Sequence, residues 1–212
     1  MRNFIILILS FFVSGAASAQ SDMRNVFINM PDSLHPYLNE NMRTELYDYY
    51  KMGVTASVDN SLGETTVLEE LTDTNAILQL NAKVRLSINV LHRSDSTNII
   101  CTIKTYKSSV EESEISFYDI NWKSIDNDFG LPKDIMSGVS PDFFLKDSLS
   151  EEDKLIVEKM EPFMVKAEFL PQNIIVITPQ CPLLENDLKK KTDAVFEQKK
   201  FKWNGEILKN IR

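Results

Sequence analysis

The sequence is poor in the residue types that form metal and redox centres. Its 212 residues include only two histidines, His35 and His92, and neither has a second histidine or a cysteine two to four positions away. The two cysteines, Cys101 and Cys181, form no Cys-x-x-Cys pair. Both histidines adjoin predicted turns, so we expect solvated side chains and not general bases. The sequence therefore predicts no metal, cofactor-binding or redox residue.

Nucleophile motifs are also missing. Gly-x-Ser-x-Gly does not occur, and Ser137-Gly138 lies in a predicted loop without a preceding strand. Acidic residues are so abundant that the sequence nominates no carboxylate pair of the kind that hydrolyses glycosides. Glu111, Glu112 and Glu114 fit a solvated turn before a strand. We predict no catalytic residue, and a hydrolase with paired carboxylates is kept as the alternative.

One acidic segment is similar to the start of a calcium loop. The run Asp126-Asn127-Asp128-Phe129-Gly130 clusters oxygen ligands, but the twelfth position, where such loops need a bidentate acid, is Ser137. An ordinary Asp/Asn/Gly turn is the preferred interpretation.

The chain lacks an excess of basic residues. It has 23 Lys and Arg against 31 Asp and Glu, a formal charge of −8, which disfavours binding to nucleic acid or to anionic lipid. A hydrophobic content of 43% is typical of a folded chain and not of a disordered one. Apolar runs after residue 20 are too short for the roughly twenty residues of a membrane-spanning helix.

The first residues have the order of a secretory signal peptide. Arg2 is followed by an apolar run from Phe4 to Val13 and by Ala17-Ser18-Ala19. The run is about half the length that spans a membrane, and no cysteine stands at the cleavage point to carry a lipid. We predict cleavage after Ala19 and a soluble protein, in the periplasm or outside the cell.

An oxidising compartment permits a disulfide between Cys101 and Cys181, provided that their Cα atoms lie within about 7 Å. Cys101 also alternates with Ile99 and Ile103, which fits a small buried residue on a strand. The sequence leaves both possibilities open.

Two short helices are predicted at the start of the mature chain. Met23, Val26, Phe27 and Met30 have helical spacing behind Asp22, and Pro31 ends the pattern. A second helix begins near Asn41 and ends at Gly53, and it carries one face of Met42, Leu46, Tyr49 and Tyr50. These tyrosines, with Tyr37 and Tyr47, fit core packing better than a groove for a sugar or peptide.

From Val54 the hydrophobic period changes to two, which predicts antiparallel strands. Val84, Leu86, Ile88 and Val90 lie on one face, with Arg85, Ser87 and Asn89 on the other. The expected strands and hairpins lie at 54–58, 65–68, 77–80, 84–90, 99–106, 115–117, 165–169, 174–178 and 201–207.

The segment 126–149 is polar and rich in Gly and Pro, which predicts a long connection and a possible subdomain boundary. Ser150 and three acids predict a helix that starts there and ends at Pro162. Leu184, Leu188 and Val195 predict another. The fold class is α+β, with residues 20–212 forming a single exported domain in which a β-meander packs with N-terminal helices.

Three segments are similar to a known group of proteins. They are residues 22–34, the run from Ser113 to Trp122, and Lys202-Trp203-Asn204-Gly205. Together they resemble an uncharacterised family of secreted proteins from Gram-negative gut anaerobes. The resemblance implies export and carries over no functional residue.

These observations favour a non-catalytic envelope protein that binds a protein or glycan partner through an exposed sheet edge or the tyrosine-rich helix. The alternative is an envelope hydrolase that acts on polysaccharide or peptide through paired carboxylates.

Overall fold

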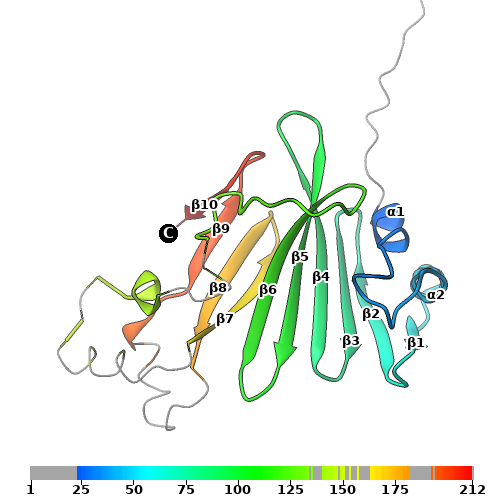
Figure 1. Ribbon diagram of the computed structural model, residues 1–212, viewed down its shortest axis with the longest axis horizontal. Helices are drawn as coiled ribbons and strands as arrows, with labels where there is room; N and C mark the ends of the chain where they lie inside the picture. Colours follow the sequence, from blue (N-terminus) through cyan, green and yellow to red (C-terminus); the bar gives the residue numbers. More distant parts are fainter. Residues whose placement is uncertain are drawn as a thin grey trace, which may run out of the picture.

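The fold consists of two antiparallel sheets and two N-terminal helices (Figure 1). The computed structural model describes residues 23–133, 135, 140–147, 149–150, 153, 157, 163–181, 192 and 194–211. The predicted α+β class with antiparallel hairpins is confirmed.

The larger sheet is a meander in which six strands pair in chain order. Its strands are β1 (Ser57–Asp59), β2 (Thr65–Leu71), β3 (Asn75–Asn81), β4 (Val84–His92), β5 (Asn98–Lys107) and β6 (Glu111–Asp119). Strand β6 starts at Glu111, so Glu111, Glu112 and Glu114 lie within a strand, and the prediction of a solvated turn was wrong. The first two glutamates extend a ladder that pairs them with Lys107 and Tyr106 of β5.

The smaller sheet has the order β10-β9-β8-β7. It comprises β7 (Met164–Leu170), β8 (Ile174–Gln180), β9 (Lys199–Trp203) and β10 (Leu208–Ile211). Both hairpins are those that the sequence predicts, and the first turns through Gln172 and Asn173 with positive φ. A short 3-10 helix, η1 (Pro141–Phe144), precedes this sheet.

Two helices precede the strands, α1 (Met23–Ile28) and α2 (Glu40–Lys51). The side chain of Asn39 accepts from the Met42 N–H at the start of α2. At its end Gly53 has a φ of 71°, and the N–H groups of Gly53 and Val54 donate to the carbonyls of Tyr50 and Tyr49. This is a Schellman motif, and it confirms the predicted stop at Gly53.

The six-stranded sheet is buried on both faces around β5. Ile100 belongs to a core that the helices cover, together with Leu86, Ile88 and Val90 of β4. Cys101, between Ile99 and Ile103 in sequence, faces the opposite core, which the four-stranded sheet covers. Residues on both sides of the predicted boundary at 126–149 contribute to this second core, which contains Phe117 of β6 and Val165 of β7 among others.

Several predictions lie wholly or partly outside the described residues. They are the signal peptide with its cleavage after Ala19, the Asp22 cap, most of the helix from Ser150 to Pro162, and most of the helix around Leu184 and Leu188. At the start of the former helix, the Ser150 and Asp153 side chains each accept from the other's N–H at 3.2 and 3.0 Å, which forms a capping box. None of the helices in the described part of the chain is long and apolar enough to cross a membrane.

A buried arginine ties the two helices together. Arg43 of α2 is 1% exposed, and its guanidinium donates to the carbonyls of Ile28, Met30 and Leu38. It also contacts the half-exposed Asp32 carboxylate at 2.9 Å. The carbonyls lie at the end of α1 and in the loop before α2, where helical geometry leaves them without intrahelical donors. Arg43 therefore holds the loop in place.

We expect Arg43→Met to lower the free energy of unfolding by about 3 kcal/mol or more, because three buried carbonyls lose their donors. Urea unfolding measures this loss. The control is Arg24→Met, because Arg24 is exposed and stacks over the Tyr47 ring at 5.2 Å, a contact worth about 1 kcal/mol or less. Equal losses for the two variants would contradict the assignment.

His35 is buried, so the prediction of a solvated turn histidine was wrong for this residue. It lies in the loop between the helices, with its ring edge-on to that of Tyr37 at 6.0 Å between centroids, and no described residue pairs with its Nδ1. Burial, with the nearby charges of Lys104 and Arg43, lowers the pKa of His35 to about 4. His92 is exposed at the end of β4, as predicted, and its Nδ1 lies 2.7 Å from the Asn98 side chain.

The lowered pKa of His35 predicts a loss of stability in mild acid. Between the unfolded pKa of 6.5 and the folded value of about 4, only the unfolded state binds the proton, so stability is complete above pH 6.5 and falls as the pH drops. From pH 8 to pH 5 this residue should cost about 2 kcal/mol. Urea unfolding at pH 8 and at pH 5 measures this loss of stability. The His35→Gln variant has no histidine at this position, so its loss between the two pH values should be smaller than that of the wild type by the same amount. If the variant lost as much stability as the wild type between pH 8 and pH 5, the prediction would be contradicted.

Candidate binding groove

A groove of about 240 Å³ lies where β7 stands against the six-stranded sheet. Its lining comes from both sheets and consists of Ile77, Arg85, Ser87, Ile103, Thr105, Glu111, Lys166, Ala167, Glu168 and Phe169. The smaller sheet packs over the β5–β6 half of this face, whereas side chains of β3 and β4 form the open floor. The groove is therefore an open ledge between two sheets.

Strand register arranges the floor in two rows. Ile77, Ser87 and Ile103 are direct neighbours across β3, β4 and β5. Arg85 and Thr105 form the next row. Both rows lie on one face of the sheet because residues two apart on a strand share a face. The sequence pattern predicted that Arg85 and Ser87 lie on a polar face of the strand. It did not predict that this face lines a groove.

The wall of the groove carries a cluster of three charges. The Lys166 ammonium lies 2.7 Å from the Glu111 carboxylate and 3.0 Å from that of Glu168. The hydrogen bond from Lys166 lowers the pKa of Glu111, and the same bond raises the pKa of Lys166. Glu111 is therefore held ionised, whereas a glycosidase needs one carboxyl group that stays protonated.

Ser113 joins the two sheets beneath this wall. Its hydroxyl oxygen accepts from the Ala167 N–H at 2.9 Å, and it donates to the Ala167 carbonyl at 3.3 Å. Thr105 Oγ1 lies 2.9 Å away. Ser113 is 3% exposed and has these contacts in place of a histidine or carboxylate base, so its geometry suits positioning and not nucleophilic attack.

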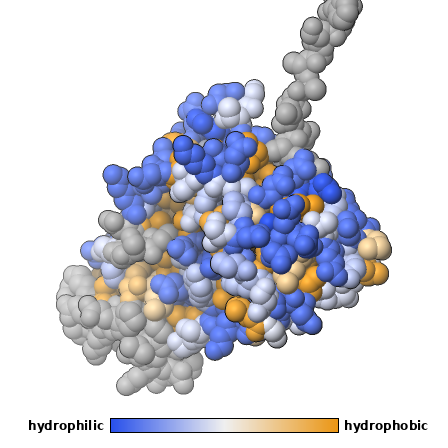
Figure 2. Space-filling view, turned by 45° about the vertical axis from the view of Figure 1, so that its right-hand side comes forward, coloured by the Kyte–Doolittle hydropathy of each residue, from blue (hydrophilic) through white to orange (hydrophobic). Residues whose placement is uncertain are grey.

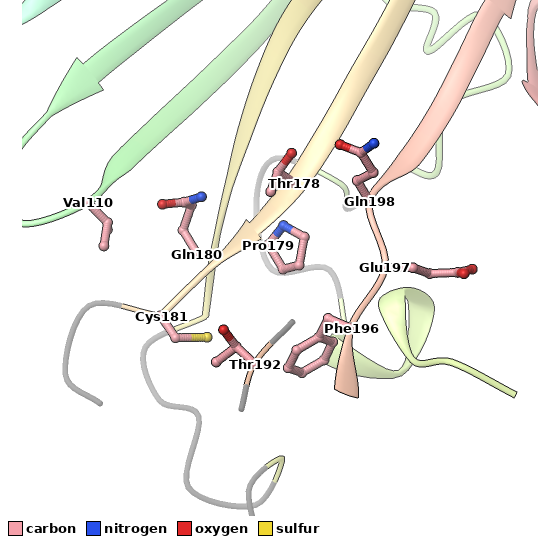
Figure 3. A pocket seen from close by; sticks show the side chains of 9 residues that line it. All are labelled: Val110, Thr178, Pro179, Gln180, Cys181, Thr192, Phe196, Glu197 and Gln198. Carbon is pink, nitrogen blue, oxygen red and sulfur yellow. The ribbon is translucent and has the colours of Figure 1, made fainter. Parts of the chain in front are cut away.

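A second hollow, of about 380 Å³, lies beside Cys181 at the end of β8 (Figure 3). Its side chains come from the β5–β6 turn, the end of β8 and the segment before β9, as Val110, Thr178, Pro179, Gln180, Cys181, Thr192, Phe196, Glu197 and Gln198. Burial raises the pKa of Cys181 to about 11 and that of Cys101 well above its usual value. Both thiols are free, so neither forms the disulfide that the sequence left open, and neither is a thiolate near neutral pH.

A third hollow, of about 370 Å³, lies along β6 and the acidic segment that was compared with a calcium loop. The Asn127 side chain accepts from the Phe129 N–H at 2.7 Å, as in an Asx turn. At Gly130 a side chain would lie 2.8 Å from the Leu208 carbonyl, so a close approach of β10 requires glycine. The turn interpretation accounts for this segment, and Ser137 lies outside the described residues.

The other predicted candidates are not brought together. His35 and His92 lie in separate parts of the fold, and the described residues contain no group of three or more His, Cys, Asp or Glu side chains placed to hold a metal. The tyrosines of α2, with Tyr37, pack partly buried against the helical core, which confirms their structural use.

The chain is similar to an uncharacterised protein family and to a solved structure. A family model described as "Protein of unknown function (DUF3256)" matches residues 16–207. The chain belongs to this family. A solved structure of "a domain of an uncharacterized protein from Porphyromonas gingivalis W83" has a TM-score of 0.73 to it at 22% identity, covering 89% of this chain and 98% of that one. At that identity the likeness shows the fold. No curated protein matches the chain.

The DUF3256 assignment confirms the resemblance to an uncharacterised family. Export stays a prediction. The groove was missed in the sequence because its parts are far apart: Glu111 and Lys166 meet only when the two sheets pack, and no local pattern links them. The one available signal was the polar face of β4 beside a buried strand.

Proposed function

We propose that this DUF3256 protein is exported to the periplasm or the cell exterior, where it binds an envelope protein or glycan without catalysing a reaction. Support for export comes from Arg2, the apolar run Phe4–Val13 and the small residues that end at Ala19. Support for binding comes from the groove between the sheets, which combines apolar, hydroxyl and charged side chains.

The export proposal predicts a processed N-terminus. Protein recovered from the periplasmic or culture fraction of an expressing Gram-negative cell should begin at Gln20. N-terminal sequencing tests this, with an Ala17→Arg, Ala19→Arg double variant as the control that should stay unprocessed. A cytoplasmic chain that retains residues 1–19 would contradict the proposal.

The groove carries the proposal because strands of both sheets line it and charged side chains stand at its wall. Broad apolar contact is less well supported as a binding mode, since apolar residues on the face in Figure 2 form small separate patches among hydrophilic ones. The hydrolase alternative has less support because Lys166 binds both carboxylates that line the groove, Glu111 and Glu168.

Filling the groove should abolish partner binding. Ser87 lies in the middle of the floor row, so Ser87→Tyr places a ring between Ile77 and Ile103. We expect at least about a tenfold loss of the partner captured from envelope extract, on the scale of a blocked central contact. Quantitative mass spectrometry of bound proteins and glycans measures the loss.

Ser57→Tyr is the matched control. Ser57 lies on the same face of the same sheet, since the register runs from Ser57 through Val67 and Gln79 to Arg85. It is on β1, outside the groove, and receives an identical substitution. Urea unfolding establishes that both variants are folded. Equal capture by wild type and Ser87→Tyr, or cleavage of an envelope polymer by the wild type, would overturn the proposal.

A further inference from the structure

The charged side chains of the groove balance. Four of them line it, two of each sign, namely Arg85, Lys166, Glu111 and Glu168. One further charge of each sign stands just outside the lining. Glu69 pairs with Arg85 at 3.1 Å, and Lys107, opposite Glu111 on β5, adds to the hydrogen bond from Lys166 in lowering the pKa of Glu111. Because attraction between charges selects a ligand of opposite sign, a balanced groove selects neither an anionic nor a cationic one.

The charges at the wall are paired with one another, which holds them in place. The Lys166 ammonium gives two of its three protons to Glu111 and Glu168 and keeps one. Each carboxylate oxygen has more than one lone pair, so Glu168, whose side chain is half exposed, still accepts. A donor and an acceptor therefore stand side by side. This arrangement suits a hydroxyl group, because a hydroxyl both donates and accepts.

The floor adds a polar group between apolar ones. The Asn89 side chain donates to the Ser87 hydroxyl at 3.0 Å, so the proton of that hydroxyl is left for a ligand. Ile77 lies next to Ser87 in the floor row, and Phe169 lines the groove from β7. Both apolar side chains are partly exposed. A ligand with hydroxyl edges and C–H faces therefore meets matching groups on wall and floor.

The groove is small, and its edge strand is blocked. Its 240 Å³ lie below the roughly 300–1,000 Å³ of pockets that enclose a drug-sized ligand. Ser113 bonds both backbone groups of Ala167 at the edge of β7, so the described strand offers no unbroken run of free backbone groups to an extended peptide. The space therefore fits a ring-sized group that is held by side chains.

We infer that the groove binds a neutral sugar unit of a glycan. This inference rests on the proposed binding function and commits it to a glycan in place of a protein. The hydroxyl groups of the sugar exchange hydrogen bonds with Lys166, Glu168 and Ser87. Its C–H face packs against the side chains of Ile77 and Phe169. The rest of the glycan extends out of the open side of the ledge.

The test is an array of oligosaccharides probed with the protein. The array carries neutral sugars, uronic acids and amino sugars, together with glycans released from the envelope of a Gram-negative cell. We expect the bound members to share a neutral sugar unit. Ser87→Tyr, which fills the groove, should lose at least about tenfold in affinity for them. Ser57→Tyr, outside the groove, should bind as the wild type does.

Removal of single hydroxyl groups locates the contact with Ser87. Ser87→Ala should bind the complete sugar about two- to tenfold more weakly, with Ser57→Ala as the control that loses nothing. For one deoxy analogue, the wild type and Ser87→Ala should bind equally, because the hydrogen bond is absent from both complexes. Calorimetry measures the affinities, and urea unfolding establishes that the variants are folded.

Salt separates a neutral ligand from a charged one. Affinity for a neutral sugar should change by less than about twofold between about 0.05 and 0.5 M NaCl, because added salt screens only the attraction between charges. A loss of about tenfold over the same range would show that the ligand is held as an ion, and it would overturn the neutral assignment.

The glycan assignment is overturned if no member of the array binds, or if the bound members are charged or bind Ser87→Tyr equally well. If envelope extract then yields a protein that Ser87→Tyr no longer captures, the proposed binding function stands and only the glycan assignment fails. If capture from the extract is insensitive to Ser87→Tyr, the proposed function of the groove itself fails.

Discussion

The rest of the structure depends on the burial of β5 on both faces. Ile100 packs into the helical core, and Cys101, its neighbour in sequence, packs into the core shared with the smaller sheet. A strand buried in this way requires a layer on each side, which gives helices over one face and a second sheet over the other. Because the second sheet covers only the β5–β6 half, the face of β3 and β4 stays open, and the groove lies along that border.

Directional polar contacts help to fix the position of the two layers, the helices and the smaller sheet, because apolar packing by itself is non-directional. Arg43 satisfies three carbonyls between α1 and α2, and Ser113 satisfies the two backbone groups of Ala167 at the edge of β7. In both cases the buried polar groups have hydrogen-bond partners, so their burial leaves no donor or acceptor unsatisfied at these contacts. The Ser113 contact also sets the direction of the β7 backbone, which links the stability of the fold to the chemistry of the ledge.

Much of the fold could be predicted because its signals are local. Alternation in 84–90 placed Leu86 and Ile88 on a buried face, and Asn204-Gly205 predicted the last hairpin. His35 and Glu111 were predicted wrongly for a shared reason. Each has the local context of a solvated turn, but the fold buries His35 within range of the charges of Lys104 and Arg43 and places Lys166 beside Glu111. Arg43 was overlooked because an arginine in a helical pattern is expected to lie on the surface unless its hydrogen-bond acceptors are known.

The sequence by itself determined the elements, their antiparallel order and the scarcity of catalytic residue types, since turn chemistry and hydrophobic period act over a few neighbouring residues. Tertiary structure alone decided which face of the meander the second sheet covers, and therefore the groove. Glu111 and Lys166 are 55 positions apart by their numbering, and Ser113 and Ala167 are 54. Contacts at such separations follow from how two sheets pack, which no local pattern encodes.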